Sequence, residues 1–91
     1  MRGESLMPSK KDLLWKLQKK PTPQNFTTQE LDALMSKCGC KKYPGGRGSS
    51  IRYVHEATKR VLQFDGPHPR NELYRYHIKM VIEFLKQIEK L

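Results

Sequence analysis

The 91-residue chain has no long hydrophobic run: its longest apolar stretches, such as 13–15 and 80–82, contain three residues. A transmembrane helix needs about 20 consecutive apolar residues, and a secretory signal peptide has an apolar core of about 7–15 residues. The sequence contains neither pattern. We therefore expect no association with membranes and a cytoplasmic location.

Cysteine is also scarce, because Cys38 and Cys40 are the only two and a single glycine separates them. This pair cannot join distant parts of the chain through a disulfide bond. A zinc site would need about four ligands, of which the pair offers two. We expect two reduced thiols, no metal site and no cofactor.

Acidic residues are few: nine Asp and Glu face 18 Lys and Arg, which leaves a net charge of +9. A field this positive attracts polyanions, first nucleic acid, then an acidic protein and then an anionic membrane. The excess lies in residues 1–20, with six bases and two acids, and in residues 41–60, with six bases and one acid. For the first run, a plain solvated surface is as good an explanation as a binding site. The second run surrounds a glycine-rich loop at 45–48, the glycine loop.

Hydrophobic periodicity and turn residues predict a single small α+β domain. A capping box formed by Thr27 and Glu30 begins one helix, and Gly39 ends it. The order is helix, helix, three strands, helix. The predicted ranges are 9–20, 27–38, 40–44, 49–56, 60–65 and 74–89.

Alternation in the second strand places Ile51 and Tyr53 on one face and Ser50, Arg52 and Val54 on the other. The tight connections between consecutive strands predict an antiparallel three-stranded sheet. Helices with one apolar stripe each must cover one face of that sheet. We therefore expect the face that carries Arg52 to stay open.

Several motifs follow one another in a characteristic order. A helix that ends in glycine precedes Gly-Gly-Arg-Gly-Ser-Ser-Ile-Arg-Tyr at 45–53, and Pro-His-Pro at 67–69 precedes Asn-Glu-Leu at 71–73 and an amphipathic helix. Over residues 26–89 the chain resembles the HicA toxin family of bacterial HicA–HicB toxin–antitoxin systems.

The resemblance implies an α-β-β-β-α fold similar to a double-stranded-RNA-binding domain, here with an extra short N-terminal helix. It implies a toxin that binds and cleaves mRNA to inhibit translation, silenced by a HicB-type antitoxin that docks on the open sheet face over Arg52. We divide the chain into an N-terminal extension with a short helix and a proline linker, 1–25, and a HicA-like RNA-binding toxin domain, 26–91.

One position departs from the family, which usually has Gly-Ser-His where this chain has Gly48, Ser49 and Ser50. The resemblance gives the catalytic role to that third position. A serine hydroxyl cannot replace imidazole as a general base near pH 7. Either another group takes over, as in a metal-independent endoribonuclease, or the chain is a catalytically inert RNA-binding module.

The catalytic candidates are Ser50 and His68. Metal-free RNA cleavage needs a proton taken from the ribose 2′-hydroxyl and one given to the leaving oxygen, tasks that suit histidine. We expect His68, between two prolines just past the third strand, to lie near Ser50, although a plain turn residue is the alternative. For His55 a buried or rim position, and for His77 a surface or packing role, are the favoured interpretations.

A third hypothesis gives residues 9–20 a protein-interaction or membrane-surface role.

For RNA binding, phosphate contacts give affinity with little sequence selectivity. Tyr43 or Tyr53 is a candidate for stacking on a base, with a core position as the alternative. The predicted RNA-binding residues are Lys41, Lys42, Gly46, Arg47, Gly48, Arg52 and Arg70.

Overall fold

The computed structural model describes residues 9–46 and 48–91. Each observed helix and strand falls inside its predicted range, which confirms the predicted order. The elements are α1 (Lys10–Leu17), α2 (Thr28–Lys37), β1 (Cys40–Pro44), β2 (Ser50–His55), β3 (Val61–Asp65) and α3 (Arg75–Gln87).

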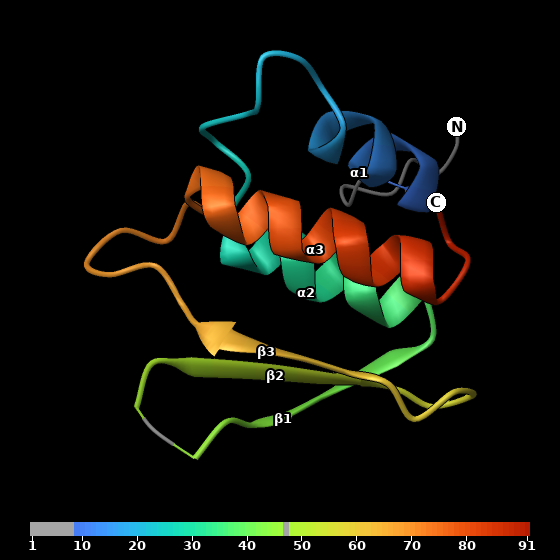
Figure 1. The fold of residues 1–91 in the computed structure, drawn as a ribbon. Helices are drawn as coiled ribbons and strands as arrows, with labels where there is room; N and C mark the ends of the chain where they lie inside the picture. Colours follow the sequence, from blue (N-terminus) through green and yellow to red (C-terminus); the bar gives the residue numbers. More distant parts are fainter. Residues whose placement is uncertain (1–8, 47) are drawn as a thin grey trace, which may run out of the picture.

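The three strands form one antiparallel sheet in the order β1-β2-β3. In Figure 1, α2 and α3 form a layer over one face of the sheet, and α1 lies on the outer side of that helix layer. The opposite face of the sheet is open. This arrangement confirms the α+β prediction and is consistent with the fold of a double-stranded-RNA-binding domain.

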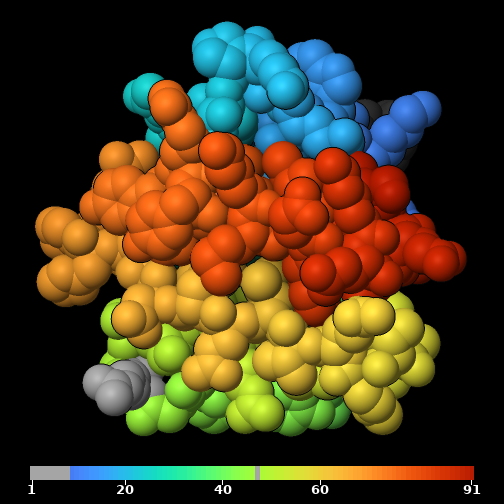
Figure 2. All heavy atoms as spheres, in the orientation of Figure 1, coloured from blue at the N-terminus to red at the C-terminus, as the bar shows by residue number. Residues whose placement is uncertain are grey.

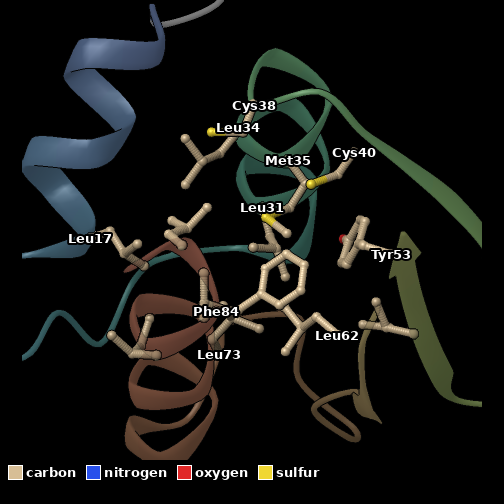
Figure 3. Close-up of a cluster of buried hydrophobic side chains, with 14 of the residues drawn as sticks. Leu17, Leu31, Leu34, Met35, Cys38, Cys40, Tyr53, Leu62, Leu73 and Phe84 are labelled. Atoms are coloured by element: carbon tan, nitrogen blue, oxygen red, sulfur yellow. The ribbon is translucent and has the colours of Figure 1, made fainter. Parts of the chain in front are cut away.

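A single cluster of buried side chains joins the sheet to all three helices. Figure 3 shows Tyr53 and Leu62 of the sheet directed toward Leu31 and Phe84 of the helices. The outermost helix, α1, contributes Leu17, which is fully buried. Although α1 shares this core, the division of the chain at residues 25 and 26 stays a prediction.

Hydrogen bonds at the start of α2 explain why the chain turns into a helix there. The Glu30 amide donates to Thr27 Oγ1 at 3.1 Å, and the Thr27 amide donates to Glu30 Oε1 at 2.9 Å, which is the predicted capping box. Lys16 of α1 pairs with Glu30 at 2.8 Å. At the other end of the helix, Gly39 has a φ of +83°, a conformation that favours glycine.

The described part of the chain contains no helix that is both long enough and apolar enough to cross a bilayer.

Candidate nucleic-acid interface

The open face of the sheet carries the side chains that point away from the helices. The burial pattern of β2 confirms that Ile51, Tyr53 and His55 face the helices, whereas Arg52 is exposed. The strand register extends the open face to both neighbouring strands. Its residues are Lys41, Tyr43, Ser50, Arg52, Val54, Val61, Gln63 and Asp65.

Lys41 and Lys42, neighbours in β1, lie on opposite faces of the sheet. Lys42 is opposite Tyr53 in the register, and its Nζ lies 3.0 Å from an oxygen of Asp32 in α2. The Tyr53 hydroxyl donates to the same carboxylate. Burial, and then the hydrogen bond to Asp32, raise the pKa of Tyr53. The structure thus separates Lys42 from Lys41 and holds it in an ion pair with Asp32.

The two tyrosines that were candidates for base stacking lie on opposite faces of the sheet. Tyr53 is 1% exposed and its ring is packed in the core, so it cannot meet a base. Tyr43 is 40% exposed and lies on the open face, opposite Arg52 in the strand register. Only Tyr43 keeps the predicted stacking role.

The loop between β1 and β2 approaches Ser50 closely. A Cβ atom added to Gly45 would lie 2.3 Å from the Ser50 Cβ, so only glycine fits at this position. Gly46 has a φ of +92°, and both Gly46 and Gly48 face open space. These two glycines therefore leave their backbone accessible. The predicted phosphate contact Arg47 lies outside the described residues.

The segment that carries His68 leaves the sheet beside the glycine loop. The Gly66 amide donates to the Ser49 carbonyl at 2.8 Å, which joins the end of β3 to the start of β2. Figure 1 shows the 66–74 loop and the glycine loop at the same end of the molecule. His68 is exposed, two residues beyond this junction. His55 lies at the opposite end of β2, where it is 6% exposed and contacts Thr58 at 2.8 Å.

His77 has a packing role and closes the loop that carries His68. Its ring is fully buried, 4.8 Å from the ring of Phe64. Its Nδ1 accepts a hydrogen bond from the Tyr74 amide at 3.0 Å. Its Nε2 therefore carries the proton and donates to the Asp65 carbonyl at 2.8 Å. This imidazole joins the end of β3 to the start of α3.

Arg70 turns toward the proline linker. Its guanidinium donates to the carbonyls of Gln24 and Glu72, each at 3.1 Å, and lies 4.9 Å from the centroid of the Tyr74 ring. Close by, the Leu73 amide donates to the Phe26 carbonyl at 2.7 Å. The Asn-Glu-Leu motif thus ties the 66–74 loop to the segment before α2. The structure does not bring Arg70 to the open face of the sheet.

The sequence reasoning missed one residue of the candidate site, Asp65. In the strand register Asp65 is the direct partner of Ser50, and both belong to the open face. Cross-strand partners have Cβ atoms about 4.5–5.5 Å apart. Pairing counted back from the turn at 56–60 would have identified it. A carboxylate, a serine hydroxyl and the 66–74 loop therefore meet at one end of the sheet.

The two cysteines are free, as predicted, and the structure buries both of them. Burial, and then the neighbouring Cys38, raise the pKa of Cys40 to about 11, so this thiol stays protonated near pH 7. Within residues 9–46 and 48–91 no three His, Cys, Asp or Glu side chains gather where they could hold a metal ion.

Comparison with known proteins places the chain in a family. The family model described as HicA toxin of bacterial toxin-antitoxin matches residues 28–89, from the first residue of α2 to just beyond α3. No significant match was found among curated proteins or solved structures. Since the family match covers most of the sequence, the chain belongs to the HicA family of bacterial toxins.

Proposed function

We propose that this toxin acts on RNA, binding mRNA at the end of the sheet where the glycine loop meets the 66–74 loop. The observation that carries the proposal is the convergence of Ser50, Asp65 and the exposed His68 segment beside the accessible backbone of Gly46 and Gly48. Lys41 and Arg52 supply positive charge on the adjoining open face. Arg47, outside the described residues, belongs to the proposed contact by its place in the glycine loop.

Cleavage at this site would proceed without a metal. The 2′-hydroxyl attacks the adjacent phosphorus after a base has taken its proton, and an acid protonates the departing 5′-oxygen. His68 and the Asp65 carboxylate are the groups available for these proton transfers, and Arg52 offers charge for the phosphorane. Ser50 contributes a hydrogen bond rather than a proton transfer, since its hydroxyl is neutral near pH 7.

A HicB-type antitoxin would neutralise this toxin in the cytoplasm by covering the open sheet face. That face combines the cations Lys41 and Arg52 with the exposed apolar side chains of Tyr43 and Val61. A partner that buries this face would cover the approach to Ser50 at the same time. In this proposal the toxin domain comprises residues 26–91, and residues 1–25 form an N-terminal extension.

Induced expression in bacteria tests the proposal. We expect growth arrest, rescue by the cognate HicB and shortened mRNA in extracts. His68→Ala and Asp65→Asn should each relieve the arrest at unchanged protein level, while Lys86→Ala on α3 serves as the control. Absence of arrest, or full toxicity in both variants, would contradict the assigned site.

The second candidate function is an inert RNA-binding module, and Ser50 favours it because the family histidine is missing. This alternative predicts RNA affinity that falls steeply with salt and RNA that stays intact during incubation. Ser50→His distinguishes the two functions. If the chain is an inert module, only the variant should cleave RNA, whereas an active enzyme should already cleave RNA without the substitution. Cleavage by the unaltered chain that Asp65→Asn removes would exclude the inert module.

A further inference from the structure

A hollow of about 700 Å³ lies between the proline linker and the first turns of α3. Figure 2 shows the linker directly beside the start of α3 on the face in view. The hollow is on the helix side of the molecule and thus distinct from the open sheet face. Residues that line it include Pro23, Arg70, Tyr74, Arg75, Tyr76 and Lys79.

Its lining combines positive charge with aromatic rings. Among the described residues that line the hollow, Arg70, Arg75 and Lys79 are cationic and none is acidic. Arg70 is already engaged by the carbonyls of Gln24 and Glu72 and by the Glu72 carboxylate at 3.6 Å, so the cations offered to a ligand are Arg75 and Lys79. Tyr74 and Tyr76 lie nearly parallel, 8° apart, with ring centroids 6.1 Å apart. Tyr76 is 56% exposed although it is a large ring. Aromatic faces beside cations suit nucleotides, because the ring stacks on a base while the cation meets a phosphate.

The hollow is continuous with the loop that carries His68. The Tyr74 hydroxyl donates to the His68 carbonyl at 3.4 Å, and one face of the Tyr74 ring lies against Arg70. The same loop therefore presents His68 on one side and forms a wall of the hollow on the other. The 66–74 loop thus connects the sheet end, where β3 finishes, to the start of α3, where Tyr76 lies.

We propose that this hollow holds a nucleotide of the RNA strand that flanks the cleavage site, with its base stacked on Tyr76 and its phosphate near Arg75 and Lys79. This inference rests on the proposed function, because it extends the same RNA beyond the 66–74 loop. It makes the hollow a positioning site that lengthens the bound segment. Stacking on Tyr76 requires an unpaired base and tolerates any base, so the hollow should select for a single strand rather than for a sequence.

Binding of the full chain to fluorescein-labelled single-stranded RNAs of four and ten nucleotides tests the proposal. Tyr76→Ala should weaken binding of the ten-nucleotide RNA about tenfold and leave the four-nucleotide RNA unaffected. Lys79→Gln should make the slope of log affinity against log salt concentration shallower, by the amount that corresponds to about one phosphate contact. A 4-thiouridine in the longer RNA should crosslink to Tyr74 or Tyr76.

Matched variants control for a general loss of charge or aromatic surface. Trp15→Ala removes a ring that is 66% exposed on α1, and Lys86→Gln removes an exposed cation near the end of α3. Both should bind the longer RNA as the unaltered chain does. Circular dichroism melting of Tyr76→Ala checks that the variant is folded.

The possible failures are distinguishable. If both RNAs bind and Tyr76→Ala weakens neither, the hollow is not an RNA site, while the proposed function stands. If the chain binds neither RNA, both proposals fail. If Tyr76→Ala instead abolishes binding of free AMP or of a polyglutamate peptide and leaves RNA affinity unchanged, the hollow serves a free nucleotide or an acidic protein.

Discussion

The two faces of the sheet differ in how their polar groups are used. On the helix-covered face, Lys42 forms an ion pair with Asp32, and the Tyr53 hydroxyl donates to the same carboxylate. On this side of the sheet both ring nitrogens of His77 are also hydrogen-bonded. On the open face, Lys41 and Arg52 are exposed to solvent. The first set holds the fold together. The second set is available to a ligand, which is why we place the RNA there.

Lys41 and Lys42 show the difference most clearly, since they are adjacent in the sequence and identical in chemistry. The alternation of β1 sends one to the open face and the other to Asp32. Composition alone therefore overstates a binding surface, because some of the cations are already engaged by acids of the same chain. The contrast between the two faces can be tested by variants on each side.

The largest effect should come from the outermost part of the helix-covered side. Leu17→Ala should lower the free energy of unfolding by about 2–5 kcal/mol, because Leu17 is fully buried and its removal leaves a cavity. Trp15→Ala on the same helix should change it by less than about 0.5 kcal/mol. Urea unfolding of both variants measures the difference. Equal small effects would mean that α1 is dispensable for the fold.

His77→Ala should have an effect of comparable size. It leaves the Tyr74 amide and the Asp65 carbonyl without their buried partner, at a cost of about 1–3 kcal/mol for each unpaired group. Hydrogen exchange should increase across the 66–74 loop before it increases in α2. A variant with unchanged exchange in that loop would show that His77 does not position His68.

Glu30→Gln should have an intermediate effect, about 1 kcal/mol, since it weakens the capping box and the pair with Lys16. Burial alone would raise the pKa of Glu30, but hydrogen bonds from Lys16 and the Thr27 amide outweigh it and hold the pKa below its usual 4.5. A lowered pKa stabilises the fold above pH 4.5, and this contribution disappears as the pH falls through the folded value.

Chemical unfolding of the unaltered chain and Glu30→Gln between pH 3 and pH 7 measures this contribution. The two stability curves should converge at the acidic end. Glu83→Gln, at an exposed position on α3, provides the matched control and should follow the unaltered chain. Curves that stay parallel to pH 3 would show that the Glu30 carboxylate does not contribute through its charge.

The smallest stability effect is expected for the two lysines. Lys42→Gln should cost about 0–1 kcal/mol, because its ion pair with Asp32 is partly exposed. Lys41→Gln should have no measurable effect on the free energy of unfolding. Thermal melts of both variants provide the comparison, and a larger loss for Lys41→Gln would reverse the assignment of the two faces.

Periodicity and caps predicted most of the fold because they are local. The capping box at Thr27, the glycine at the end of α2 and the alternation of β2 depend on residues close in sequence. The candidate site was only partly predictable. The pairing of Asp65 with Ser50 appears only when the register of β2 and β3 is counted from the turn at 56–60. Strand alternation separates Lys42 from Lys41, but no pattern around Lys42 identifies its ion-pair partner Asp32 in α2.

Arg70 illustrates the same limit. We predicted Arg70 as an RNA-binding residue around the glycine loop, whereas in the structure its guanidinium donates to the Gln24 carbonyl, 46 residues away in the sequence. The proline linker that provides this partner appeared in the sequence only as an extended segment. A cation's availability therefore follows from its tertiary neighbours.

The most direct test of the central claim is the affinity for RNA of Arg52→Gln and Lys42→Gln, measured by fluorescence anisotropy from 50 to 200 mM salt. We expect the unaltered chain to bind with a steep salt dependence, Arg52→Gln to bind more weakly with a shallower slope, and Lys42→Gln to bind normally. Equal losses in both variants, or an affinity no greater than that of an unrelated polypeptide of the same charge, would contradict the claim that the open face holds the RNA.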